Sequence, residues 1–129
     1  MVKELPFDIK DKCIYYVGPS QSAPGKVIGS AGPTTATRMD KYAPELFDKG
    51  LQSCIGKGKR SKEVKDAIVR NKAVYFVTVG GLGALLSKCV EKSEYVAYSD
   101  LGCEQILKLT VKDFPVFVGA DMYGGDIYE

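Results

Sequence analysis

The sequence has 129 residues, of which 45% are hydrophobic and 26% are charged, as in an ordinary globular protein. A formal net charge of +2 is too small to indicate a nucleic-acid-binding surface, and no apolar run approaches the roughly 20 residues that cross a bilayer. The amino-terminus has no apolar signal core, so we expect a cytoplasmic protein with one domain over 1–129, in which 1–11 is a polar lead-in.

The chain contains no histidine and four cysteines, which limits its chemistry. Cys13, Cys54, Cys89 and Cys103 are far apart and lie among apolar residues, so we expect buried free thiols rather than metal ligands. Without histidine the commonest general base is missing, and a metal site made by this chain alone is not expected. Acid–base chemistry must use other groups, or groups from another chain.

The first half of the chain alternates short strands and helices. Proline and glycine set the boundaries, because proline interrupts a helix interior and glycine commonly ends a helix. Ser61 is expected to cap a helix whose buried side carries Val64, Ala67 and Ile68. In chain order we expect strands at 13–17 and 27–28, helices at 33–42 and 44–50, a strand at 51–55 and a helix at 62–71.

The second half contains the strongest strand signal, the almost entirely apolar run 73–79, which is typical of a central strand. In chain order we then expect a helix at 84–90, a strand at 95–98, a helical turn at 101–107 and strands at 107–111 and 115–120. Strands and helices follow one another without a regular βαβ repeat. The sequence therefore predicts an α/β fold with a mixed sheet.

The stretch Gly29–Asp40 reads GSAGPTTATRMD and has the features of an anion-binding site. Its small residues let the backbone approach a ligand closely, and Pro33 suits the first position of a helix. Thr34 and Thr35 would then lie in the first turn, where unpaired N–H groups and the helix dipole favour an anion. Arg38 would lie on the same face and needs an anionic partner. The alternative is a capped helix with a surface arginine.

Lys57 lies between two glycines at the end of a predicted strand. A lysine at the carboxyl edge of a sheet points into the usual ligand crevice of α/β folds, although a solvated loop lysine fits the sequence equally well. The cations Arg60, Lys62 and Lys65 are predicted to form an exposed helix face. Glu104 and Asp121 are candidate catalytic acids, with nothing to prefer them over other carboxylates.

Two glycine-rich loops lack nucleotide signatures. Gly80-Gly81-Leu82-Gly83 follows a strand but does not have the GxGxxG spacing, and Gly56-Lys57-Gly58 lacks the other residues of a phosphate-binding P-loop. We expect the first of these loops to serve tight packing of a strand against a helix.

Several motifs occur together in one order. The run Gly29 to Thr35 followed by Arg38-Met39-Asp40 is the most distinctive, and the segments 14–19, 55–58, 100–104 and 121–128 accompany it. In these motifs nearly the whole chain resembles the β subunit or C-terminal region of the class I, iron–sulfur fumarate hydratase and L-tartrate dehydratase family. It differs from that family by lacking an opening segment with an Arg-Asp-x-Ala-His type run.

The resemblance implies a swivelling β/β/α domain that closes one side of the active site of a hydro-lyase. The complete enzyme would hydrate fumarate reversibly to L-malate, or dehydrate L-tartrate, with a [4Fe–4S] cluster. The cluster would be held by an α subunit and not by this chain, which would be inactive alone and would join a higher hetero-oligomer. A non-catalytic anion-binding or regulatory module of the same fold, a fragment and a divergent domain remain alternatives.

The resemblance also assigns roles to four residues. Thr34, Thr35, Arg38 and Lys57 match the positions that contact the C4 dicarboxylate substrate. Thr34 is expected to be catalytic, as the group nearest the carbon that exchanges a proton, and Thr35 to hydrogen-bond a carboxylate. Arg38 suits bidentate binding of a carboxylate, and Lys57 adds a second positive charge.

Overall fold

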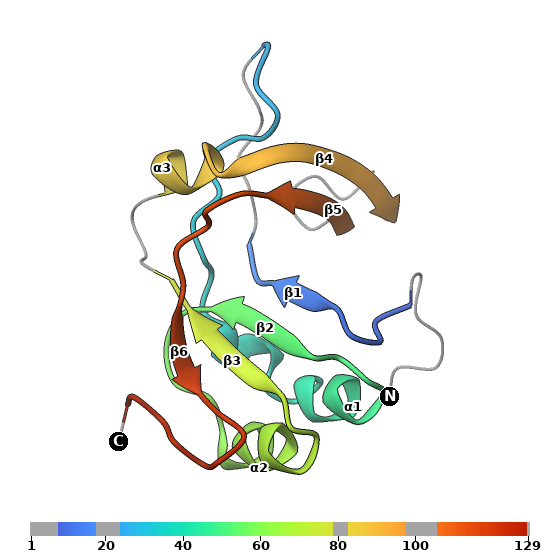
Figure 1. Ribbon diagram of the computed structural model, residues 1–129, viewed down its shortest axis with the longest axis vertical. Coiled ribbons are helices and arrows are strands. Elements are labelled where there is room, and N and C mark those ends of the chain that lie inside the picture. The colour runs from blue at the N-terminus through green and yellow to red at the C-terminus, as the bar shows by residue number, and fades with distance from the viewer. Residues whose placement is uncertain (1–7, 18–23, 79–82, 98–105, 129) are drawn as a thin grey trace.

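The computed structural model describes residues 8–17, 24–78, 83–97 and 106–128. The elements in chain order are β1 (Cys13–Tyr15), the 3₁₀-helix η1 (Ala36–Met39), α1 (Ala43–Asp48), β2 (Ser53–Gly56), α2 (Lys62–Arg70), β3 (Val74–Val77), α3 (Gly83–Ser87), β4 (Val90–Ala97), β5 (Ile106–Val111) and β6 (Phe117–Ala120) (Figure 1).

The larger sheet has the strand order β1-β2-β3-β6, and β4 and β5 pair in a second, smaller sheet. β1, β2 and β3 run parallel, whereas β6 pairs antiparallel with β3. Ile14 stands opposite Cys54, and Cys54 opposite Tyr75. This arrangement confirms the predicted α/β class with a mixed sheet, and it confirms that the apolar run at 73–79 contributes a central strand.

The main core lies where α1 and α2 pack on one face of the larger sheet (Figure 1). α2 forms as predicted, because the Ser61 side chain accepts a hydrogen bond from the Val64 N–H at 3.3 Å and caps the helix. Val64, Ala67 and Ile68 are fully buried, as their helical spacing requires. Within the described residues, no helix is both long enough and apolar enough to cross a membrane.

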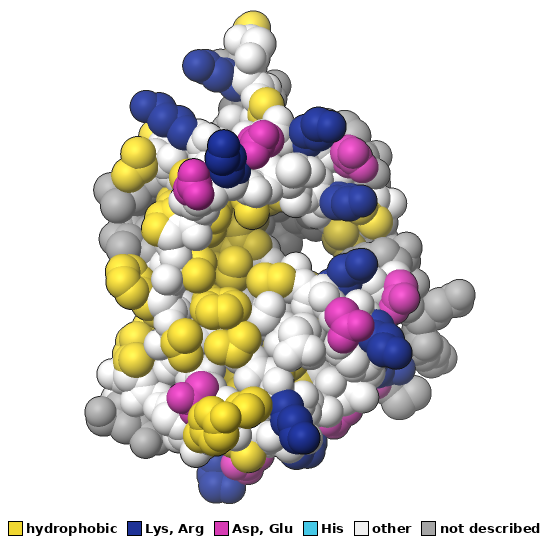
Figure 2. Space-filling model, in the orientation of Figure 1, with side chains coloured by type: hydrophobic (Ala, Val, Ile, Leu, Met, Phe, Trp, Pro, Cys, Tyr) yellow, Lys and Arg dark blue, Asp and Glu magenta, His cyan; other side chains and the backbone are white. Residues whose placement is uncertain are grey.

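A second, smaller cluster of buried residues, Ile28, Ala31 and Val90, lies beside the small sheet. The larger sheet also leaves apolar side chains uncovered near its β6 edge, where Phe117 is 62% exposed. Figure 2 shows hydrophobic side chains gathered over β3 and β6, on the view that looks onto the sheet. The two buried clusters thus contain residues from different parts of the chain.

Several elements differ from the predicted ones. No strand forms at 27–28, and the lead-in is not wholly unpacked, because Ile9 is 3% exposed and joins the main core. The helix expected at 84–90 ends at Ser87, and Val90 already begins β4. The expected turn at 101–107 lies mostly outside the described residues, and its end belongs to β5. The pairing of β4 with β5 sets the last two of these boundaries. They could not be predicted, because the sequence of one strand does not show which strand it pairs with.

Candidate functional site

The segment after the glycine-rich turn is extended rather than helical. Pro33 forms an isolated bridge with Val17, and the Thr34 N–H and hydroxyl both donate to the Tyr16 carbonyl, at 2.8 and 3.1 Å. η1 begins only at Ala36. The predicted helix start at Pro33 is therefore wrong, and the Thr34 N–H group is not a free helix N-terminal donor for an anion, because it is already bonded.

The same segment brings Thr35 beside Lys57. Thr35 forms a parallel bridge with Lys57, and the Ala36 N–H donates to the Lys57 carbonyl at 3.0 Å. Gly56 permits this approach, since a Cβ there would lie 3.1 Å from the Ala36 Cβ and 3.0 Å from the Tyr16 ring. Two residues chosen from separate motifs are thus neighbours at the carboxyl ends of β1 and β2.

Arg38 and Lys57 supply the positive charge of this region. Lys57 directly follows β2, as predicted, and its side chain is exposed. Arg38 is exposed on η1, and within the described part of the chain its guanidinium has neither a hydrogen bond nor an ion pair. The four proposed site residues therefore occupy two adjoining backbone segments, with Thr34 half-buried and the other three exposed.

Arg60 is buried, contrary to the prediction of an exposed cationic face. It is 6% exposed, and its Nε donates to Asp40 Oδ1 at 2.7 Å. Lys62 is exposed and pairs with Asp66, whereas Lys65 is partly buried and pairs with Asp126. Its ion-pair partner Asp40 lies 20 residues earlier in the chain, so no residue next to Arg60 in the sequence signals its burial.

The groups around Arg60 are kept in their neutral forms by burial. Burial raises the pKa of the Cys54 thiol, and the nearby Arg60 charge lowers it by less. Burial likewise raises the pKa of the Tyr16 and Tyr75 hydroxyls far above the ordinary value. These side chains therefore act as packing and hydrogen-bonding partners of the guanidinium and not as acids or bases at neutral pH.

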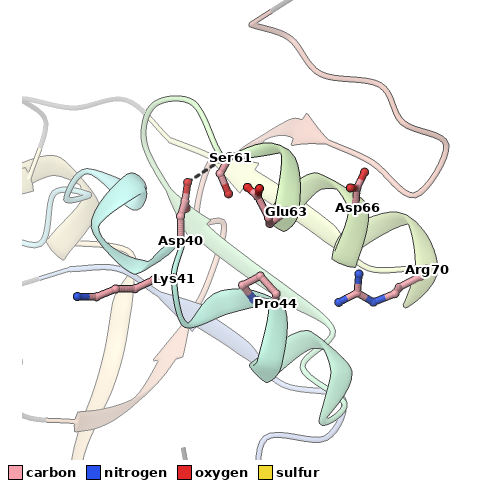
Figure 3. Close-up of a pocket in the computed structure, with 7 residues that line it drawn as sticks. All are labelled: Asp40, Lys41, Pro44, Ser61, Glu63, Asp66 and Arg70. Carbon is pink, nitrogen blue, oxygen red and sulfur yellow. Dashed lines mark hydrogen bonds between the residues drawn. The ribbon is translucent and has the colours of Figure 1, made fainter. Parts of the chain in front are cut away.

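A separate groove of about 650 Å³ lies between α1 and α2. Its lining residues, drawn in Figure 3, are Asp40, Lys41, Pro44, Ser61, Glu63, Asp66 and Arg70. Carboxylates dominate it, Arg70 is already paired with Asp48, and Lys41 points away from α2 (Figure 3). This groove does not suit an anion, and none of the four candidate residues lines it.

The other sequence candidates that the structure describes do not form a site of their own. Among the residues that the structure describes, no three His, Cys, Asp or Glu side chains gather to hold a metal ion, so these residues do not fit an iron–sulfur cluster. Asp121 Oδ1 accepts hydrogen bonds from the N–H groups of Tyr123 and Gly125, both at 2.9 Å, which is the role of a turn residue. Cys103 and Glu104 lie outside the described residues.

Gly83, the first residue of α3, packs against the glycine-rich turn. The Ala31 N–H donates to the Gly83 carbonyl at 2.9 Å. A Cβ on Gly83 would collide with the Ser30 hydroxyl and would lie 2.8 Å from the Gly32 nitrogen. The predicted tight packing of the glycine loop therefore occurs at Gly83, and the segment that packs against Gly83 is the glycine-rich turn. Residues 80–82 lie outside the described residues.

We expect Gly83→Ala to lower the free energy of unfolding by about 1–3 kcal/mol, since an added methyl overpacks this contact. Urea denaturation of the purified chain measures the loss. Leu85→Ala is the control, because Leu85 lies in the same helix and is 54% exposed. An unchanged unfolding midpoint for Gly83→Ala would show that the turn shifts to accommodate the methyl group without loss of stability.

Comparison with known proteins covers the whole chain. Residues 1–129 match the family model described as Fumarase C-terminus. The chain is 43% identical over 129 residues to "Fumarate hydratase class I, anaerobic" of Escherichia coli K12, a match over 98% of this chain and 24% of that protein. It is 34% identical over 133 residues to "Putative L(+)-tartrate dehydratase subunit beta" of Methanocaldococcus jannaschii, over 98% of this chain and 68% of that protein.

A third relative is "Fumarate hydratase 2" of Leishmania major, which is 40% identical over 127 residues, 96% of this chain and 22% of that protein. The chain thus spans less than a quarter of the length of these fumarate hydratases and about two thirds of the tartrate dehydratase subunit.

Proposed function

The chain belongs to the Fumarase C-terminus family, and from this premise we propose that it is the β component of a class I hydro-lyase that interconverts fumarate and L-malate. The names of its relatives, fumarate hydratases and tartrate dehydratase subunits, support this class of reaction. On this proposal the chain is a swivelling β/β/α domain that closes one side of the active site. An α partner carries the [4Fe–4S] cluster, and the two chains form a larger hetero-oligomer.

The observation that carries the proposal is the pairing of the Thr35 segment with Lys57, together with Arg38 on the same segment, whose guanidinium has no hydrogen bond or ion pair among the described residues. A C4 dicarboxylate bears two negative charges, and one of its carboxylates requires a cationic pocket with hydrogen-bond donors. Arg38 suits bidentate binding of that carboxylate. Lys57 adds a second charge, and the exposed Thr35 hydroxyl adds a donor.

Thr34 is proposed as the group that exchanges a proton with the substrate carbon. Its hydroxyl is oriented by the hydrogen bond to the Tyr16 carbonyl at 3.1 Å, which leaves the lone pairs of its oxygen available to the substrate. A threonine hydroxyl is a weak base, so this role requires activation by the positive charges of Arg38 and Lys57.

Dehydration of L-tartrate is the second candidate function. It is favoured by the match over 68% of a protein named as a tartrate dehydratase β subunit. Tartrate and malate differ by one hydroxyl group and present the same two carboxylates to Arg38 and Lys57. A substrate profile of the assembled enzyme with malate, fumarate and tartrate separates the two candidates.

The test of the proposal is Arg38→Ala in the enzyme assembled with its α partner. The KM for fumarate should rise by the equivalent of about 2–5 kcal/mol, because the substrate carboxylate loses its bidentate partner. Steady-state kinetics measure the change. Arg70→Ala is the matched control, since Arg70 is also an exposed arginine and pairs with Asp48 on α1.

Equal KM values for Arg38→Ala and Arg70→Ala would contradict the proposed site. Tight binding of fumarate, malate or tartrate by the isolated chain would instead favour an anion-binding module that works without an α partner.

A further inference from the structure

We propose that the buried Arg60–Asp40 ion pair is a positioning device that holds the Lys57 loop (residues 57–60) in register with the Thr35 segment (residues 34–38). The inference rests on the proposed function, in which these two segments bind the substrate carboxylate. Arg60 and Asp40 do not touch the substrate on this view. They act through the backbone that carries Lys57, Thr35 and Arg38.

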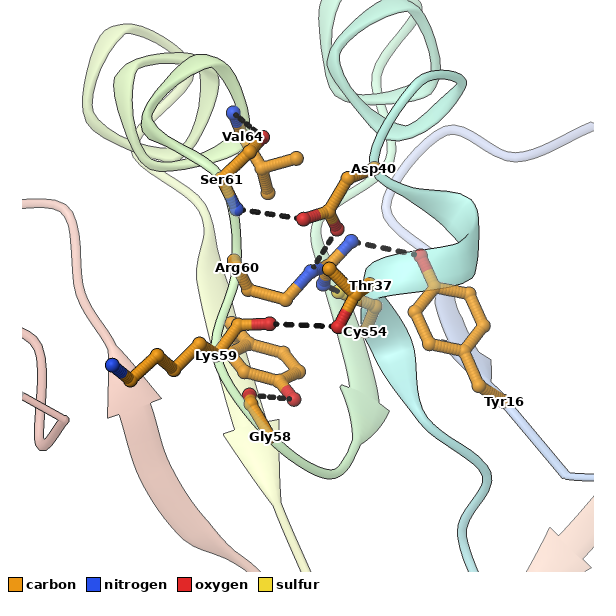
Figure 4. Close-up of polar contacts among 10 residues, drawn as sticks. Tyr16, Thr37, Asp40, Cys54, Gly58, Lys59, Arg60, Ser61 and Val64 are labelled. Carbon is orange, nitrogen blue, oxygen red and sulfur yellow. Dashed lines mark hydrogen bonds and ion pairs between the residues drawn. The ribbon is translucent and has the colours of Figure 1, made fainter.

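Both carboxylate oxygens of Asp40 accept hydrogen bonds at the far end of the loop. Oδ1 accepts from Arg60 Nε at 2.7 Å, and Oδ2 accepts from the Ser61 N–H at 2.6 Å. The side chains of Arg60 and Asp40 are only 1% and 10% exposed. Because Asp40 directly follows η1, the carboxylate ties the end of the Thr35 segment to the start of α2 (Figure 4).

The guanidinium of Arg60 is fixed on its other sides as well. Its carbon lies 4.7 Å from the centre of the Tyr75 ring and 5.3 Å from that of the Tyr16 ring, distances typical of cation–π contacts. Its Nη1 lies 3.1 Å from Cys54 Sγ, and its Nη2 lies 3.5 Å from the Tyr16 hydroxyl. Arg60 is therefore anchored to β2 and β3, and a lysine offers neither this planar stacking nor the rigid fork of donors of a guanidinium.

The contacts between the two segments form a series that starts at the proposed site and ends at the ion pair. At the site, Thr35 forms a bridge with Lys57, and the Ala36 N–H donates a hydrogen bond to the Lys57 carbonyl at 3.0 Å. Next comes the Thr37 hydroxyl, 3.5 Å from the Lys59 carbonyl, and last the charged pair (Figure 4). The charged link thus lies farthest from the proposed substrate site, where it can set the register without competing for the ligand.

The middle of the loop is held against the sheet. The Tyr75 hydroxyl donates to the Gly58 carbonyl at 2.9 Å, and the Gly58 N–H donates to the Tyr128 hydroxyl at 3.2 Å. Backbone contacts at Lys57, Gly58 and Lys59 thus fix the path of the loop, and the side chains of Lys57 and Lys59 are exposed. A buried ion pair is weak evidence for added stability, because desolvation offsets much of the attraction. The positioning role proposed for the ion pair depends on its fixed geometry and not on added stability.

The test compares Asp40→Asn and Arg60→Lys with Asp48→Asn and Arg70→Lys. The second pair is the control, since Arg70 is also bound to an aspartate, by two hydrogen bonds of 2.9 and 2.8 Å to Asp48, but on the exposed surface. In the 129-residue chain we measure amide hydrogen exchange of Ala36, whose N–H reports the link at the site. The Ala73 N–H, bonded to Ile68 at 2.9 Å, reports the stability of the core.

The expected result is an increase of about tenfold or more in Ala36 exchange for the Asp40 and Arg60 variants, well above any change at Ala73, and no increase for the control variants. In the enzyme assembled with its α partner, the same two variants should raise the KM for fumarate by about tenfold through misplacement of the binding groups. Asp40→Asn is nearly isosteric, so it keeps the test informative if Arg60→Lys folds poorly.

Unchanged Ala36 exchange in the Asp40 and Arg60 variants overturns the positioning role. Increased Ala36 exchange with a normal KM for fumarate also overturns it, if Arg38→Ala raises that KM. In that case the proposed function stands and only the positioning role fails. If Arg38→Ala also leaves the KM unchanged, the proposed function itself fails, and the link between the ion pair and substrate binding fails with it.

Discussion

A Thr34→Ala substitution should lower the kcat of the assembled enzyme by about 10²–10⁴-fold, the range for losing a positioned proton-transfer group, while KM changes little. The reason is local, because the Thr34 N–H keeps its 2.8 Å bond to the Tyr16 carbonyl and the segment stays in place. Only the hydroxyl proposed to exchange a proton with the substrate carbon is removed. Steady-state kinetics and exchange of solvent deuterium into malate measure the effect.

Two further variants separate chemistry from packing at this position. Thr34→Ser keeps the hydroxyl and should retain most of the turnover, whereas Thr110→Ala, at an exposed threonine of β5, should behave as the wild type. A nearly normal kcat for Thr34→Ala would remove Thr34 from the proposed chemistry and leave it a structural residue that orients the backbone.

Phe47→Ala should lower the free energy of unfolding by about 3–5 kcal/mol, because it deletes a buried aromatic ring and leaves a cavity. Phe47 is 1% exposed and packs in the main core. Such a loss is a large share of the roughly 5–15 kcal/mol by which domains are stable. Urea denaturation measures it at equilibrium.

Phe117→Ala is the matched control for this experiment, since Phe117 is the same residue type on β6 but is 62% exposed. Its substitution should cost far less. Equal losses for the two variants would mean that the β6 surface is covered in solution or that α1 is loosely packed.

The parts of the fold that depend on local signals were predictable from the sequence. α2 is the clearest case, because its cap, Ser61, and its buried side, with Val64, Ala67 and Ile68, all lie within one short stretch. The segment at Pro33 was not predictable in the same way. Its proline and threonines are typical of a helix start, but the backbone of Tyr16 and Lys57 pairs with them instead.

The candidate site, too, was predictable only where local signals were enough. Residue types and motif order indicated Thr34, Thr35, Arg38 and Lys57, but nothing in either motif predicts that Thr35 and Lys57 are paired. The burial of Arg60 was missed because the cation is compensated by partners from distant segments, above all Asp40, 20 residues earlier in the chain. Contacts between distant segments must be observed, since propensity describes only neighbours in sequence.

The stretch Gly29–Asp40 is anchored at its two ends in different cores. Ala31 belongs to the small cluster with Ile28 and Val90, whereas Ala36 belongs to the main core, and both alanines are fully buried. Thr34 and Thr35 lie between these anchors. A ligand that binds them only in the folded chain favours the state in which this connection is formed, so its binding free energy stabilises the segment that joins the two clusters.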